Sequence, residues 1–191
     1  MNGVALTFDD GPHPEGTTAV LEILSDAKVP ATFFLVGEQV ERSPSLAAEI
    51  AAAGHEIALH CQRHRNLLRL TPGQVRTDLD RAIEAIFNAT GKAPLLHRPP
   101  YGIFTGPALS IVRHRQWRPL LWSRWGRDWS ANATPSSIAA LVTRDLSEGD
   151  VLLLHDSDSY SSEGSWRRTV AALPRILDEI GRRGLTVASV R

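Results

Sequence analysis

Apolar residues along this chain occur alternately in short runs and in longer stretches with helical spacing. Glycine, proline and polar residues bound the short runs, and we predict strands at 4–8, 31–36, 56–59, 95–98, 119–123, 151–155 and 185–190. The longer stretches carry apolar residues three and four positions apart, and we predict helices at 17–27, 45–53, 71–90, 106–115, 135–146 and 166–183. Pro44 and Pro72 support two of these helices, because proline is favoured in the first turn.

Strands that alternate strictly with helices predict an α/β fold, with a parallel sheet and helices outside it. Seven strands fit either an open, doubly wound sheet or a distorted barrel. In both architectures, functional residues gather at the carboxyl ends of the strands. The sequence has no internal repeat and no change of composition that would divide it, so we expect one domain over residues 1–191.

The composition narrows the classes of partner. The 191 residues include 21 basic and 21 acidic side chains, a balance that points to neither nucleic acid nor an anionic membrane surface. No apolar run approaches the roughly 20 residues that cross a bilayer.

The sequence starts with a predicted strand rather than a signal peptide, which favours a cytoplasmic protein or a shortened form of a secreted or cell-wall one. Cys61 is the only cysteine, which excludes an internal disulfide. We also expect the protein to be a monomer.

Two adjacent carboxylates follow the first predicted strand. Asp9 and Asp10 lie between that strand and a turn at Gly11 and Pro12. Neighbouring residues of a strand point to opposite faces, so both carboxylates can serve one site only if the turn redirects one of them. An aspartate that caps the next helix is the simpler interpretation, and the residues at the other strand ends decide between the two.

The third predicted strand leads into His60 and His64. Their i, i+4 spacing places both imidazoles on one side of a helical turn. Taken alone, the pair is more readily interpreted as two surface histidines beside Arg63 and Arg65. Two histidines and one aspartate with open positions, however, form a ligand set suited to zinc or another divalent transition metal. A carboxylate from another strand end would therefore complete a metal site.

With these residues in view, the chain resembles the NodB-homology polysaccharide deacetylases, which are the fourth carbohydrate esterase family. The motifs that carry the resemblance occur in the family's order and span nearly the whole chain. They are Thr7-Phe8-Asp9-Asp10-Gly11-Pro12, His60 with His64, Arg98-Pro99-Pro100-Tyr101-Gly102, Asp128-Trp129, and Leu153-Leu154-His155-Asp156. The resemblance implies a distorted (β/α) barrel of about seven parallel strands in a single domain. It also implies metal-dependent hydrolysis of an N-acetyl group, or sometimes an O-acetyl group, on a sugar.

The family's scheme, matched residue by residue, implies the roles of the polar motif residues. Asp10, His60 and His64 become the ligands of one divalent metal, with zinc expected first and cobalt or nickel as alternatives. Asp9 becomes the general base, and His155 becomes the general acid. This division is chemically consistent, because a bound metal lowers the pKa of its water and an imidazole can protonate a leaving amine.

Two further matches concern the partners of this acid and base. The scheme pairs Arg98 with Asp9, and an arginine that ends an apolar strand is indeed costly to bury without a carboxylate. It also makes Asp128 the acid that orients His155. Without Asp9 nearby, an exposed charge at the end of a strand would be the preferred interpretation of Arg98.

The remaining matches concern the substrate. The family uses the backbone N–H at the position of Tyr101 for the oxyanion, in a loop that Pro99 would help to stiffen. Trp129 and Leu153 match an acetyl pocket with an apolar wall. Four of the five tryptophans lie in one short stretch and offer platforms for sugar rings, although we prefer a core position for the first of them: Trp117, Trp122, Trp125 and Trp129.

The chain departs from the family's pattern at two positions. Cys61 replaces the usual serine or threonine between the histidines; we expect it to be partly buried and structural, and a metal-ligating thiol is the alternative. Trp125 replaces an acidic residue, which puts the polymer specificity in doubt. Arg124 and Arg127 beside it are either solvated or face an acidic substrate. The serine-rich loop 157–165 is expected to be mobile and to gate the site.

We therefore expect an enzyme that removes N-acetyl groups from a carbohydrate of the peptidoglycan or chitin type. One alternative is a cytosolic deacetylase of a small acetylated amino sugar or glycosylated metabolite, and another is an O-acetyl xylan esterase. A more distant alternative is an inactive carbohydrate-binding module. The presence of both a candidate base and a candidate acid argues against that last interpretation.

Overall fold

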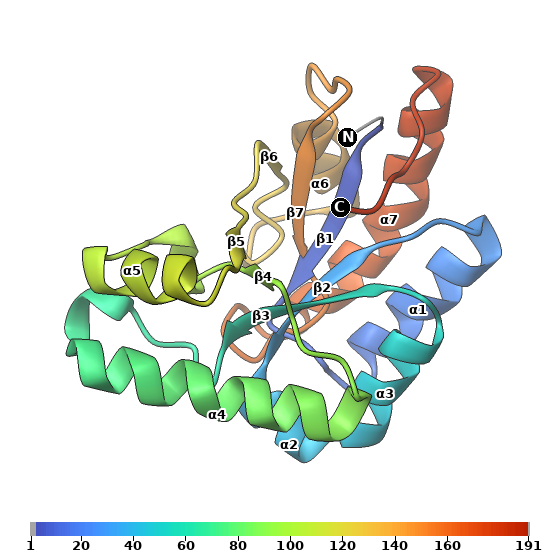
Figure 1. The fold of residues 1–191 in the computed structure, drawn as a ribbon. Coiled ribbons are helices and arrows are strands. Elements are labelled where there is room, and N and C mark those ends of the chain that lie inside the picture. The colour runs from blue at the N-terminus through green and yellow to red at the C-terminus, as the bar shows by residue number, and fades with distance from the viewer. Residues whose placement is uncertain (1–2, 191) are drawn as a thin grey trace.

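The central sheet is built from seven parallel strands in residues 3–190, the part of the chain that the computed structural model describes (Figure 1). Their order across the sheet is β5 Arg118–Pro119, β4 Leu96–His97, β3 Glu56–Cys61, β2 Thr32–Val36, β1 Ala5–Asp9, β7 Val151–His155 and β6 Arg124–Trp125. Within these residues the edge strands β5 and β6 do not pair with each other, so the sheet is a curled, open barrel. The predicted single-domain, distorted barrel is confirmed; residues 1, 2 and 191 of that domain lie outside the described residues.

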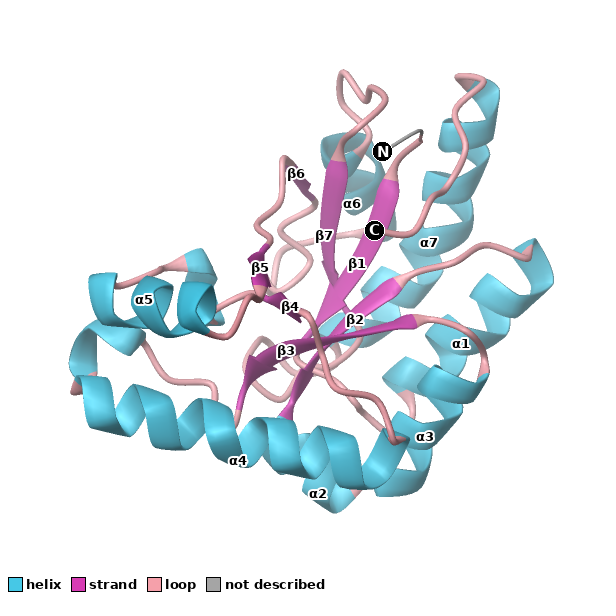
Figure 2. Cartoon of the chain, viewed as in Figure 1, coloured by secondary structure: helices cyan, strands magenta, loops and turns pink. Residues whose placement is uncertain are grey.

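Helices cover the outside of the sheet, as Figure 2 shows in cyan. They are α1 Gly16–Ala27, α2 Gly37–Arg42, α3 Pro44–Ala52, α4 Pro72–Thr90, α5 Gly106–His114, α6 Pro135–Val142 and α7 Ser165–Arg182. The proline signals are confirmed, because Pro44 and Pro72 are the first residues of α3 and α4. None of the helices that the structure describes has the length and apolarity needed to cross a bilayer.

The core lies on both faces of the sheet. Every residue of β1 and β2 is buried, which explains why these strands read as continuous apolar runs rather than alternating ones. On the outer face, the rings of Phe8 and Phe33 stack at 5.2 Å beneath the helices. A smaller cluster around Ala5, Phe34 and Leu96 fills the inner face. Apolar side chains therefore pack against both faces of the sheet, and the candidate site lies at its carboxyl-end rim.

Two predicted strands differ from the structure. The prediction of one strand at 119–123 is wrong, because the chain pairs at Arg118–Pro119 and again at Arg124–Trp125 and is irregular in between. The carbonyls of that irregular stretch face inward and accept hydrogen bonds from the Arg98 guanidinium instead. The predicted strand 185–190 is reduced to a single bridge between Val4 and Val187.

Candidate active site

The carboxyl ends of the parallel strands bring the predicted polar residues together. Asp9 ends β1 and lies beside His155, the last residue of β7, in the register of the sheet. His60 lies near the end of β3, and Arg98 follows β4 directly. The convergence expected from the alternation of strands and helices therefore takes place at one rim of the barrel.

The two adjacent carboxylates face the same cavity. Asp10 has a φ of 79°, a left-handed conformation that few residues other than glycine adopt, and the Gly11–Pro12 peptide that follows is cis. Because of this local turn, the Asp10 side chain does not point to the face of the sheet opposite that of Asp9, as both carboxylates require if they serve one site. Both side chains are only 4% exposed, so each carboxylate depends on specific partners rather than on water.

Asp10 gathers two histidines into a cluster. Its Oδ1 lies 3.5 Å from Nε2 of His60 and 3.4 Å from Nε2 of His64, and the three candidate ligand atoms lie within 4.8 Å of one another. The same buried oxygen has no hydrogen-bond partner within residues 3–190. An orphaned carboxylate oxygen facing two imidazole nitrogens is the donor set that a divalent transition metal uses, so these residues fit such an ion.

The backbone beneath the histidine pair differs from the prediction. His60 belongs to β3, and His64 lies in the irregular segment that follows, so the expected helical turn is wrong. The two rings meet because the chain bends after the strand, with centroids 5.3 Å apart. Burial lowers the pKa of His64, which favours the neutral imidazole that metals bind. Burial by itself raises the pKa of Asp10, but the closeness of His60 and the charges of His155 and His64 outweigh it and lower that pKa.

Asp9 has a different partner from its neighbour. Nη1 of Arg98 donates to Oδ1 of Asp9 at 2.6 Å and to the Thr7 hydroxyl at 2.9 Å. Arg98 is completely buried, and its guanidinium lies 3.9 Å from the centre of the Phe34 ring. The second oxygen of Asp9 faces the histidine cluster, 4.0 Å from Nε2 of His60. One oxygen is thus fixed by the ion pair, while the other points to the site.

His155 is held by Asp128. Its Nδ1–H donates to one oxygen of Asp128 at 3.0 Å, and its backbone N–H donates to the other at 2.7 Å. Burial by itself lowers the pKa of His155, but the charge and hydrogen bond of Asp128, with Asp10 and Asp9 nearby, raise it to about 10. At neutral pH the imidazole is therefore protonated, and its Nε2 lies 4.0 Å from Asp10.

A cavity of about 310 Å³ opens over these polar groups. Tyr101, Trp129 and Leu153 line it, whereas Pro99 does not; the carbonyl of Pro99 instead accepts a backbone hydrogen bond that closes the Tyr101 turn. Tyr160, in the serine-rich loop, also lines the cavity, and nothing in the sequence singled it out. Trp122, which the sequence indicated only as one of four clustered tryptophans, also lines the cavity.

The positions that depart from the family's pattern do not line this cavity. Cys61 is buried and lies outside the group of candidate ligands, and burial raises the pKa of its thiol well above the usual value. Trp125 is 42% exposed on β6, beside Leu153 in the register. Arg124 pairs with Asp150 at 3.1 Å, so this guanidinium already has a carboxylate partner.

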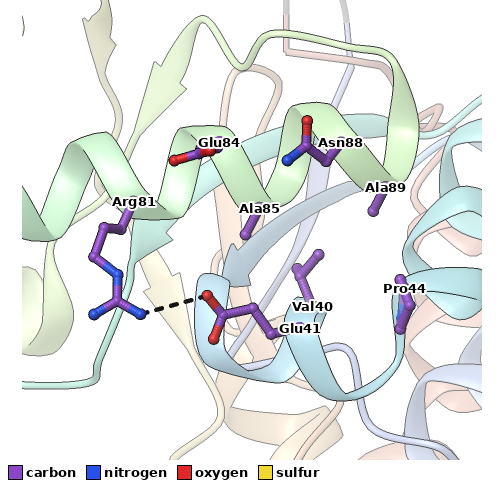
Figure 3. Close-up of a pocket in the computed structure, with 8 residues that line it drawn as sticks. All are labelled: Val40, Glu41, Pro44, Arg81, Glu84, Ala85, Asn88 and Ala89. Carbon is purple, nitrogen blue, oxygen red and sulfur yellow. Dashed lines mark ion pairs between the residues drawn. The ribbon is translucent and has the colours of Figure 1, made fainter.

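A second cavity, between α2, α3 and α4, has a different chemistry (Figure 3). Arg81 and Glu41, which both line this cavity, form an ion pair at 3.7 Å. None of its lining residues is shared with the cavity over the strand ends, and it contains no histidine or cysteine. The group of candidate metal ligands therefore lies at the other cavity, at the rim of the barrel.

Comparisons with known proteins agree with this geometry. The family model described as polysaccharide deacetylase matches residues 2–119. A peptidoglycan-N-acetylglucosamine deacetylase of Bacillus cereus is 35% identical over 190 residues, covering 98% of this chain and 85% of that protein. A chitooligosaccharide deacetylase of Bradyrhizobium sp. is 36% identical over 191 residues, covering 96% and 87%. A solved family 4 carbohydrate esterase from Streptomyces lividans in complex with acetate matches with a TM-score of 0.88 and 32% identity, covering 100% of this chain and 94% of that one.

Proposed function

Because this chain belongs to the polysaccharide deacetylase family, we propose that it is a metal-dependent hydrolase that removes N-acetyl groups from a carbohydrate containing N-acetylglucosamine. One observation carries the proposal. The cluster of Asp10, His60 and His64 lies between two separately partnered groups, a carboxylate paired with arginine and an imidazole paired with aspartate. A metal site flanked by a candidate base and a candidate acid is what amide hydrolysis requires.

We assign Asp10, His60 and His64 as the ligands of one divalent metal, zinc in the first place. A metal ion bound there would polarise the acetyl carbonyl and lower the pKa of a water molecule. His60 is prepared for this role, because its Nδ1–H donates to the carbonyl of Arg98 at 2.7 Å and leaves Nε2 free to face Asp10. The orphaned oxygen of Asp10 is the strongest local sign that a cation belongs here.

Asp9 is assigned as the general base. The ion pair with Arg98 fixes the orientation of the carboxylate, so that its second oxygen points to the cavity. That oxygen can accept a proton from a water molecule while the water attacks the acetyl carbonyl. Asp10 is assigned as the ligand instead of Asp9, because its Oδ1 lies 3.5 and 3.4 Å from the two imidazole nitrogens, whereas the second oxygen of Asp9 lies 4.0 Å from Nε2 of His60.

His155 is assigned as the general acid. The partnership with Asp128 keeps the imidazole protonated at neutral pH and aims Nε2 at the cavity. The proton at Nε2 can pass to the amine as the bond between carbon and nitrogen breaks. Asp128 acts through His155 and has no contact with the cavity, so its role is positioning.

The walls of the cavity suit an acetylated sugar. Leu153 supplies an apolar surface for a methyl group, and the edge of Trp129 lies against His155 at 5.5 Å between ring centroids. We assign the oxyanion contact to the backbone N–H of Tyr101, whose φ of 62° is unusual for a residue other than glycine. Relatives named for peptidoglycan and chitooligosaccharide support N-acetylglucosamine as the sugar unit.

Acetate release from a panel of substrates tests the proposal. The protein is stripped with a chelator, reloaded with Zn²⁺ or Co²⁺, and given chitooligosaccharides, peptidoglycan fragments, acetylated xylan and small N-acetylated amino sugars. We expect metal-dependent release from the chitooligosaccharides or the peptidoglycan fragments, and none from a His64→Gln control. If the wild-type protein binds sugar but releases no acetate from any substrate, the hydrolase is disproved.

A further inference from the structure

We propose that Tyr160 is a positioning residue for His64, holding that imidazole by ring stacking in the orientation that metal binding needs. The proposal rests on the function argued above, in which His64 is a metal ligand. It assigns a role to the loop between β7 and α7, to which no other part of the proposed mechanism gives a task. Tyr160 makes no hydrogen bond to His64 and acts through the placement of its ring.

The two histidines of the cluster are oriented in different ways. Nδ1 of His60 is fixed by the carbonyl of Arg98 at 2.7 Å, which is the usual arrangement for a metal-binding imidazole. Nδ1 of His64 is buried and has no hydrogen-bond partner within residues 3–190. A metal-ligating His64 therefore needs another source of orientation, since a freely turning ring would lose its alignment with Asp10.

Aromatic contacts supply that orientation. The ring of Tyr160 stacks on the imidazole of His64 with centroids 4.5 Å apart and planes inclined by 13°. Tyr101 meets the same imidazole edge-on at 4.7 Å, with planes inclined by 68°. Contacts on a face and at an edge together restrict both the tilt and the rotation of the ring. The stacking partner covers the larger surface, and for that reason we assign the main restraint to Tyr160.

Tyr160 is itself anchored from α2. Its hydroxyl donates to Oε1 of Glu38 at 2.6 Å and accepts from Nε2 of Gln39 at 3.0 Å. Burial raises the pKa of the Tyr160 hydroxyl, with Glu38 adding to the effect, so the group remains a donor at working pH. The stack on His64 is thus connected to a helix of the scaffold and does not depend on the loop alone.

Zn²⁺ affinity tests the proposal without reference to turnover. The dissociation constant is measured by competition with a chromophoric chelator for the wild type, Tyr160→Phe, Tyr160→Leu and Trp129→Leu. Phenylalanine keeps the stack, so its affinity should stay within about threefold of the wild type, whereas leucine should weaken binding by about tenfold or more. Trp129→Leu is the matched control, because it removes an aromatic wall that touches His155 and not His64.

The outcomes distinguish a failure of the proposal for Tyr160 from a failure of the proposed metal-dependent function. A wild-type protein that binds no Zn²⁺ disproves the metal site itself. A wild-type protein that binds Zn²⁺ while Tyr160→Leu binds it equally well overturns the role of Tyr160 and leaves the metal site standing. Thermal melting confirms that each variant is folded, and Tyr160→Asn replaces the leucine variant if leucine is insoluble. Equal weakening in the phenylalanine and leucine variants also counts against stacking, since only the anchored hydroxyl would then matter.

Discussion

Asp9 and Asp10 show how much the surroundings of a residue decide its chemistry. They are adjacent and equally buried, yet one is bound to a guanidinium and the other faces two imidazoles. The left-handed backbone at Asp10 is what separates them, because it lets neighbouring side chains meet different partners in one cavity. The same residue type can therefore serve as proton acceptor and as metal ligand.

Variants of the two aspartates should separate these roles. Asp9→Asn should lower kcat by about 100-fold or more, because a neutral amide accepts no proton, while Zn²⁺ affinity stays within about threefold. Asp10→Ala should lose most Zn²⁺ affinity and activity together, since it removes one of the three proposed ligands. Both quantities are measured on folded protein, by acetate release and by chelator competition. Equal loss of Zn²⁺ from the two variants would contradict the division of roles.

Asp128→Asn should move the alkaline limb of the pH–activity profile to lower pH. His155 must be protonated to act as an acid, so activity falls as pH rises through its pKa. Burial by itself lowers that pKa, but Asp128, with smaller contributions from Asp10 and Asp9, raises it to about 10, and removal of the Asp128 charge should bring the limb down by about one unit or more. Thr169→Val is the control, because its hydroxyl donates to the same carboxylate but carries no charge. An unmoved limb in Asp128→Asn would show that His155 is not the acid.

At the scale of residues, the sequence was sufficient to predict which motif residues would lie close together. It was not sufficient to predict contacts of residues outside the motifs. The cost of burying an unpaired arginine predicted that Arg98 contacts a carboxylate, and the family's scheme named Asp9 as that partner; the structure shows the contact. The spacing of His60 and His64 suggested a helical turn, although the chain reaches the same proximity through a bend after a strand. Tyr160 lies in a serine-rich loop without periodicity, and its stack on His64 depends on a tertiary contact between distant segments.

At the scale of elements, periodicity predicted the long helices and the buried strands but not the short connections. Of the seven α-helices within residues 3–190, six were predicted. The exception, α2, has only six residues, and Val40 is its only buried large apolar residue. Its importance is nevertheless high, because it carries the two side chains that anchor Tyr160. The stretch between β5 and β6 looks like a strand because it is apolar, but its carbonyls bind Arg98 rather than a neighbouring strand.

Two helical glycines should respond in opposite ways to alanine. A Cβ at Gly37, the first residue of α2, would clash with the Gln62 side chain and lie 2.9 Å from the Ala82 Cα of α4. Gly37→Ala should therefore destabilise the protein by about 1–3 kcal/mol. Gly73→Ala, in the first turn of α4, meets nothing within 4 Å and should be neutral or stabilising by about 0.5 kcal/mol. Urea unfolding compares them, and equal stability would mean that α2 and α4 lie further apart.

At the scale of the whole molecule, the same contacts that shape the site also hold the barrel together. Arg98 follows β4 and reaches across the inner face to Asp9 and Thr7 on β1 and to the carbonyls of Leu120 and Leu121. The curl of an open sheet is not encoded in any single strand, and for that reason the sequence left the choice between doubly wound sheet and barrel to family resemblance. One buried guanidinium connects β1 with the stretch that follows β5.

Arg98→Met should consequently affect the stability of the whole fold. It leaves the buried Asp9 carboxylate without its partner, and we expect a loss of about 3–5 kcal/mol in the free energy of unfolding. Adding Asp9→Asn should recover part of the lost stability, because the unpaired charge is then removed. Urea unfolding of both single variants and of the double variant measures the coupling free energy between Arg98 and Asp9. Arg81→Met breaks the exposed pair with Glu41 and should change stability by about 1 kcal/mol or less. If Arg98→Met is no less stable than that control, the interior ion pair does not hold the barrel.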